Sequence, residues 1–125
     1  MPSFRSLAGG SVLINSTGLD KLSGDLAGTI DDVLHKGAFD IEAAGKSIAR
    51  RKNIIDTGAL INSIHVKTQR QLFYVIGPTV HYAIYQEFGT RRFGARPFMR
   101  PALNKNRLPI LNACKEAIER HGSII

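Results

Sequence analysis

The sequence predicts an α+β fold in which a small antiparallel β-sheet is packed by a long N-terminal helical segment and a C-terminal helix. Three observations carry this prediction. Apolar residues recur at helical spacing over residues 21–52, two short β-favouring runs follow at residues 63–68 and 72–77, and residues 101–121 again show a helical pattern. Helices on one face of the sheet would bury the apolar side of both layers. The 125 residues suit one domain spanning the chain.

The first third is expected to hold a strand and a long helix. Residues 1–10 look like a flexible tail, and SVLINS at residues 11–16 favours a strand. In the helix that follows, acidic residues lie near the start and basic residues at the end, which suits the helix macrodipole. Gly37 and Gly45 each weaken the helix by about 1 kcal/mol relative to alanine, so we expect a kink or break near Gly37.

The middle of the chain predicts a capped helical turn followed by a hairpin. Asp56 can cap a short turn over residues 59–61, with Gly58 as a turn residue. Only residues 69–71 separate the two β-favouring runs, and such a short connection indicates a hairpin.

The last third predicts two helices joined by a basic loop. Residues 81–88 suit a short aromatic helix that Gly89 would end. Pro97 favours an extended backbone before it, and Pro101 suits the first turn of the C-terminal helix. Pro109 removes a hydrogen bond from the interior of that helix, so we expect a kink or restart just before it.

Composition narrows the possible partners. The net charge of +7 and the isoelectric point near 10.0 favour nucleic acid, anionic membranes or acidic protein surfaces. No apolar run approaches the roughly 20 residues that a membrane span needs. The N-terminal stretch makes a poor signal peptide, so the protein is expected in the cytosol when it is made. Cys114 is the only cysteine, which excludes an intrachain disulfide and a cysteine-based metal cluster.

One motif points towards catalysis. The sequence IIDTGA at residues 54–59 resembles the active-site turn of retroviral-type aspartic proteases, in which two chains each contribute one Asp. That turn should follow β-strands, but here a helical pattern precedes it. Residues 75–77 also follow too soon to leave room for a flap hairpin. We therefore interpret Asp56 as a helix cap and predict that the protein is not an enzyme.

The sequence shows no further catalytic, metal or cofactor motif. None of the four histidines lies at the i, i+4 spacing of a helical metal pair. HExxH, a Gly-Xaa-Ser-Xaa-Gly elbow and a glycine-rich phosphate loop are all missing from the sequence. We expect neither a metal nor a cofactor.

A basic stretch without acids follows the short aromatic helix. Phenylalanines are interleaved with its cations, a mixture that suits a single-strand nucleic-acid platform or a protein-docking loop. The alternative is a solvated basic face with Phe98 anchored in the core; for Arg91 and Arg92 we favour partner contact. The cations are Arg91, Arg92, Arg96, Arg100, Lys105 and Arg107.

Three blocks occur in a fixed order: DTGALINSI at residues 56–64, YAIYQEFGT at 82–90 and ARPFMRPAL at 95–103. In this order and spacing they resemble the neck and tail-completion proteins of long-tailed bacteriophages, the group that includes the lambda minor tail protein Z type. That family shows DTGxLxxSI, YAxxxExGT and ARPFxxPAL blocks. The resemblance spans about residues 18–120. It departs from the family at Pro109, where the family helix usually runs on, and at Asn62, where a basic residue is common.

The resemblance implies an α+β fold and a structural role in the virion, joining the filled head to the tail. It implies other neck and tail proteins as partners, a ring of like copies meeting head to tail, and neither catalysis nor a cofactor. The basic loops would face an acidic neighbour or DNA in the channel. A basic nucleic-acid-binding protein remains the alternative function, ahead of a dimeric aspartic protease using Asp56.

The blocks also suggest physical roles for their residues. We expect Tyr82, Tyr85 and Phe88 to pack the short helix over the sheet. Glu87, the one acid in a basic neighbourhood, is expected to pair with a loop arginine (Arg91, Arg92 or Arg96) and to orient the loop more than stabilise it. The interface hypothesis comprises Arg91, Arg92, Arg96, Arg100 and Glu87. The structural motif comprises Asp56, Gly58, Tyr82, Tyr85, Gly89, Pro97, Phe98 and Pro101.

Overall fold

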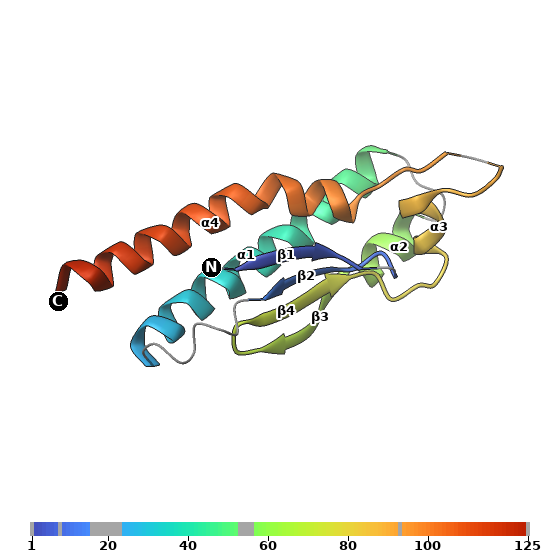
Figure 1. The fold of residues 1–125 in the computed structure, drawn as a ribbon. Helices are drawn as coiled ribbons and strands as arrows, with labels where there is room; N and C mark the ends of the chain where they lie inside the picture. Colours follow the sequence, from blue (N-terminus) through green and yellow to red (C-terminus); the bar gives the residue numbers. More distant parts are fainter. Residues whose placement is uncertain (1, 8, 16–23, 53–56, 93, 125) are drawn as a thin grey trace.

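The structure is a computed structural model that describes residues 2–7, 9–15, 24–52, 57–92 and 94–124. Within these ranges, four strands and four helices follow one another (Figure 1). They are β1 (Ser3–Ser6), β2 (Val12–Asn15), α1 (Gly24–Arg51), α2 (Thr57–Ser63), β3 (His65–Arg70), β4 (Phe73–Gly77), α3 (Ala83–Phe88) and α4 (Met99–Ile124). The predicted α+β class is confirmed.

The four strands form one antiparallel sheet in the order β1-β2-β4-β3. The predicted strand at residues 11–16 and the predicted hairpin are confirmed as β2 and as the β3–β4 pair. The first hairpin strand begins later than predicted, at His65, and it includes Gln69 and Arg70, which the sequence places in the connection. The prediction of a flexible tail is wrong for residues 3–6, which form the edge strand β1. Phe4 pairs with Ile14 in the ladder, and its side chain packs against the core, so one aromatic residue anchors this strand.

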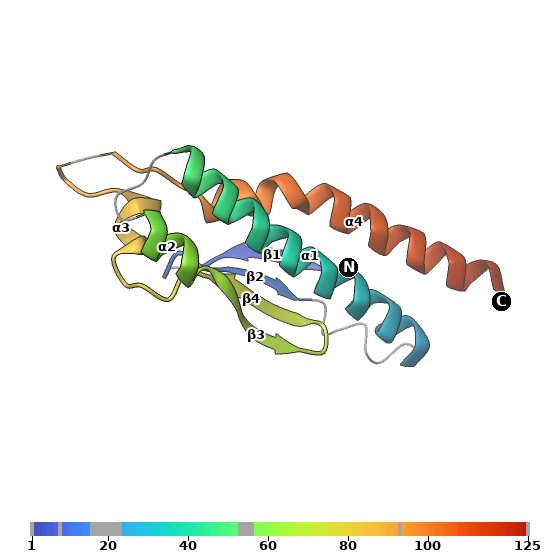
Figure 2. The same cartoon turned by 180° about the vertical axis from the view of Figure 1, so that it is seen from behind.

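Both long helices cover the same face of the sheet, as predicted. Val12 and Ile14 of β2 and Tyr74 and Ile76 of β4 are buried, and each alternates with a half-buried neighbour, which is the period of a strand with one covered face. Figures 1 and 2 show α1 lying across this face and α4 running beside α1.

The two long helices approach each other closely at two glycines of α1. A Cβ atom on Gly37 would lie 2.5 Å from the Ile110 side chain, and one on Gly45 would lie 2.7 Å from the sulfur of Met99. The expected break near Gly37 is wrong, because α1 runs uninterrupted from Gly24 to Arg51. Packing against α4 outweighs the low helix propensity of glycine.

Helix α4 does not restart at its proline. It continues through Pro109 as a single element, so the restart expected near Leu108 does not occur. Leu108 and Pro109 are both exposed. Water can therefore satisfy the carbonyl group that loses its helical partner at the proline.

Helix α1 also holds the hairpin turn between β3 and β4. Leu72 has a φ of 63°, which is uncommon for a residue with a side chain, and it is buried. One carboxylate oxygen of Asp31 accepts hydrogen bonds from the Leu72 N–H and the Tyr74 hydroxyl, each at 2.8 Å. Burial, with the hydrogen bond to Asp31, raises the pKa of the Tyr74 phenol. These contacts explain how the hairpin forms without glycine or asparagine in its turn.

Candidate interaction surface

The second and third sequence blocks meet at a buried carboxylate. Glu87, on α3, is fully buried, and its two oxygens accept three backbone hydrogen bonds. The donors are the N–H groups of Phe98 at 2.8 Å and of Met99 and Arg100 at 3.0 Å. The first N–H groups of a helix have no partner within it, so Glu87 caps α4 from a different helix.

The predicted ion pair of Glu87 with a loop arginine is wrong. Arg91, Arg92 and Arg96 are exposed, whereas Glu87 is buried with its oxygens turned towards the start of α4. Glu87 therefore holds the backbone of residues 98–100 in place from inside the protein, and its own side chain is not exposed for contact with a partner. Burial raises the pKa of its carboxyl group, because lost hydration outweighs the opposing effects of the three N–H donors and of the Arg100 charge.

The loop between α3 and α4 is tied to the fold at both ends. Gly89 ends α3 with a φ of 80°, and its N–H donates to the carbonyl of Tyr85 at 2.8 Å. A Cβ atom on Gly89 would lie 2.7 Å from the backbone nitrogen of Ala95, so a side chain here would collide with the returning strand of the loop. The Arg96 N–H donates to the Gln86 carbonyl at 2.7 Å.

A second anchor comes from the residue that follows α1. The ammonium group of Lys52 donates to the carbonyl of Pro97 at 2.6 Å. Phe98 follows with a fully buried side chain, and Pro101 lies half-buried in the first turn of α4. Residues 96–98 are thus fixed in place by contacts from α1, α3 and the core.

Two of the three aromatic side chains predicted to pack α3 over the sheet point to solvent instead. Tyr85 is 51% exposed and Phe88 is 44% exposed, so the expected packing of these rings over the sheet is wrong; Tyr82 alone packs against the core. The buried residues of α3 are Ala83, Gln86 and Glu87. Because Glu87 must face inwards to cap α4, the helical repeat turns its neighbour Phe88 and the same-face Tyr85 outwards.

The first block is described only in part. Gly58 lies in the first turn of α2 and not in a connecting turn. Asp56 lies outside the described residues. The described element that precedes it in sequence is the helix α1, which ends at Arg51, whereas a strand precedes the aspartic-protease turn.

Exposed aromatic and basic side chains gather where α3, the loop and α4 meet. We call this surface the aromatic-basic corner. It comprises Tyr85, Phe88, Arg91, Arg92, Arg96 and Arg100. The Arg100 guanidinium lies 5.7 Å from the centre of the Phe88 ring, within cation–π range. Arginine and exposed aromatics are enriched where proteins bind partners.

The described residues show little else that could act as a site. A shallow groove of about 110 Å³ between α1 and α4 is lined by residues such as Val33, Gly37, Ile110 and Ala113, and it includes no residue of the corner. Among the described residues, no group of three or more His, Cys, Asp or Glu side chains could hold a metal ion. No helix in the described ranges is long and apolar enough to cross a membrane.

Comparison with protein families identifies the class of this chain as a bacteriophage tail component. The family model described as "Bacteriophage HK97-gp10, putative tail-component" matches residues 16–89, which is more than half of the chain. The chain belongs to this HK97 gp10-like family. No curated protein and no solved structure matches the chain.

The family match bears on the resemblance drawn from the three blocks. It confirms a phage tail-component family, and with it a structural role in the phage tail and a place in the virion. It covers the first block and nearly all of the second. The third block, at residues 95–103, lies beyond the matched span, yet Glu87 hydrogen-bonds to the backbone of this block.

Proposed function

We propose that this tail component is a neck or tail-completion protein of the lambda minor tail protein Z type, which joins the DNA-filled head to the tail and has no enzymatic activity. It would be made in the host cytoplasm and would assemble as a ring with other neck or tail proteins as partners. The aromatic-basic corner supports this proposal most directly. Two exposed rings on α3 and four exposed cations on the loop and the first turn of α4 lie together, and Glu87 and Lys52 hold the segment where the loop enters α4.

The corner has the chemistry of a docking surface. Tyr85 and Phe88 offer apolar area that water hydrates poorly, and the arginines offer planar donor groups for carboxylates or phosphates. A preformed loop loses less conformational entropy on binding than a flexible one, so more of the contact energy appears as affinity. This suits a protein that must hold two large assemblies together.

The test is electron microscopy of a lysate from the source phage, or from an induced prophage, with a stop codon early in this gene. Full heads beside separate tails, or tails with faulty ends, are expected. A plasmid copy of the intact gene should restore joined particles, which controls for effects on neighbouring genes. Normal particles in the uncomplemented lysate would remove the joining role.

Nucleic-acid binding is the second candidate, because the exposed rings and arginines of the corner could stack on bases and neutralise phosphates. Contact with DNA in the channel would use the same residues. Affinity for DNA should then fall steeply with salt as counterions are released. Negligible binding of single- and double-stranded DNA at physiological salt would leave protein docking as the use of the corner.

A further inference from the structure

The charges of α1 are separated along its length. Residues 24–42 of α1 contain five acids and one lysine, whereas residues 43–51 contain three cations and no acid, and Lys52 follows directly after the helix. At 1.5 Å per residue, the 28 residues of α1 span about 42 Å. The two ends of this helix therefore differ in sign over a distance several times the screening length of roughly 8 Å at physiological salt.

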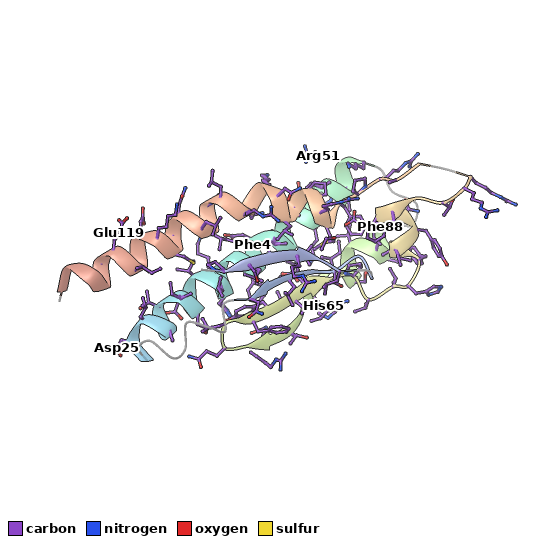
Figure 3. The ribbon with its side chains drawn as sticks, viewed as in Figure 1. Phe4, Asp25, Arg51, His65, Phe88 and Glu119 are labelled. Atoms are coloured by element: carbon purple, nitrogen blue, oxygen red, sulfur yellow. The ribbon has the colours of Figure 1, made fainter. Side chains whose placement is uncertain are left out.

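Helix α4 extends this separation because it runs antiparallel to α1. Met99 contacts α1 at Gly45 and Ile110 contacts it at Gly37, so the later turns of α4 lie beside the acidic half of α1. Figure 3 shows Asp25 and Glu119 at one end of the molecule and Arg51 and Phe88 at the other.

We call these two surfaces the acidic end and the basic end. The acidic end comprises the exposed residues Asp25, Asp32, Glu116 and Glu119. Lys115 and Arg120 lie on the same stretch of α4, so the excess of acid comes from α1. The basic end is the aromatic-basic corner together with the exposed Arg50 and Arg51.

We infer that the basic end of one copy binds the acidic end of a second copy of this chain. Pairing like ends would bring like charges together, whereas pairing unlike ends gives both charged surfaces of every interior copy a partner of opposite sign. Such a head-to-tail contact is heterologous, and it generates a ring when the rotation between copies closes. The inference rests on the proposed function, which calls for a ring of like copies, and it names the surfaces that meet.

A second copy explains more of the molecule than DNA does. DNA would engage the basic end and leave the acidic end without a role. DNA passing close to the acidic end would also be repelled by it. A contact between copies uses both ends, and the exposed rings of Tyr85 and Phe88 supply apolar area at its centre.

The test uses two charge-reversal variants that each disable one end of the full chain. Arg91→Glu/Arg92→Glu reverses two of the six charges of the basic end, and Asp32→Lys/Glu119→Lys reverses two of the four charges of the acidic end. All four positions are exposed, and Asp31, whose carboxylate holds the hairpin turn, is left intact. Arg5→Glu/Lys105→Glu is the matched control for the basic-end variant, because it makes the same change of net charge as Arg91→Glu/Arg92→Glu at exposed positions that belong to neither end.

Sedimentation velocity over a range of concentrations at low salt measures association, and thermal melts confirm that every variant folds. Wild type and control should associate, and added salt should weaken that association. Each end variant alone should need at least about tenfold more protein to associate. An equimolar mixture of the two end variants should associate again, because an intact acidic end then meets an intact basic end.

Three results would overturn the inference. In the first, wild type stays monomeric at every concentration. In the second, wild type associates but the folded end variants fail to associate when mixed. In the third, the acidic-end variant associates like wild type while the basic-end variant does not, which would assign the corner to DNA or to another tail protein.

Complementation separates this inference from the proposed function. If the stop-codon lysate is defective and Asp32→Lys/Glu119→Lys restores normal joined particles, the joining role stands and the contact between copies falls. If the stop-codon lysate already contains normal particles, the joining role falls whatever the sedimentation shows.

Discussion

Replacing Glu87 tests whether a carboxylate from α3 organises the start of α4. Glu87→Ala leaves three N–H groups without their acceptor, and each unsatisfied buried group costs about 1–3 kcal/mol. The net loss of stability is smaller than the sum of these three costs, because the alanine variant no longer buries a carboxylate, and burial disfavours the charged form of Glu87. We therefore expect Glu87→Ala to lower the free energy of unfolding by about 3–5 kcal/mol.

Glu87→Gln gives a graded version of the same test. Its oxygen can still accept from Met99 and Arg100, but its amide group would point N–H donors at the N–H of Phe98. One lost acceptor should cost about 1–3 kcal/mol, so this variant should lie between wild type and Glu87→Ala.

Urea unfolding measures these differences, and hydrogen exchange locates them. Exchange should accelerate at the amides of residues 98–100 in both variants. The matched control is Glu119→Ala, an exposed glutamate on α4 whose removal should change stability by no more than about 0.5 kcal/mol. A Glu87→Ala protein within 1 kcal/mol of wild type, with unchanged exchange at these amides, would refute the cap.

The pKa of Glu87 gives this test a pH dependence of definite sign. The folded state holds the Glu87 proton more tightly than the unfolded chain does, because burial raises the pKa in the folded state. Stability contributed by this group is therefore fully present below the ordinary glutamate pKa and is lost as the pH rises through the raised value. The stability of wild type relative to Glu87→Gln should accordingly increase as the pH is lowered from neutral.

Three further substitutions test the core and the helix contacts. Phe98→Ala removes a fully buried ring and should lower the free energy of unfolding by about 3–5 kcal/mol; an unchanged melting temperature would contradict its role as an anchor. Gly28→Ala should raise the melting temperature, because alanine is the better helix former and a Cβ atom there meets no atom within 4 Å. Gly37→Ala should lower the melting temperature, because its Cβ atom would push on Ile110. Equal shifts for the two variants would refute the close contact of α1 and α4. The raised pKa of Tyr74 means that folded protein loses stability as the pH rises above about 10, and Tyr74→Phe should reduce this alkaline loss in urea titrations.

Much of the fold follows from periodicity and turn chemistry alone. The long apolar pattern of α1 and the two β-favouring runs of β3 and β4 are local properties, so the sequence predicts them well. Strand β1 escaped prediction because its one apolar anchor, Phe4, gives no alternating pattern. Its pairing depends on β2, which a local pattern does not encode.

The candidate surface could be predicted in composition but not in arrangement. The arginines and aromatic residues of the corner stand out in the sequence, whereas the orientation of α3 does not. Tyr82, Tyr85 and Phe88 form an aromatic stripe that a periodicity argument places inwards. The structure buries the polar pair Gln86 and Glu87 instead, because the unpaired N–H groups at the start of α4 need an acceptor. These N–H groups begin at Phe98, eleven residues after Glu87, so their need for an acceptor can be inferred only when the relative positions of α3 and α4 are known.

The buried cap and the exposed corner are linked, and the link leads to a last prediction. Glu87 contacts no solvent, yet it fixes the segment from which the corner displays Arg96 and Arg100. Glu87→Gln should therefore weaken association between copies although it removes no surface group. Gly37→Ala is the matched control, since it also destabilises the fold but acts between α1 and α4 at the Ile110 contact. If both variants, compared at a temperature where each is folded, associate equally well, the corner does not depend on the cap; a loss confined to Glu87→Gln would show that the carboxylate prepares the surface for binding.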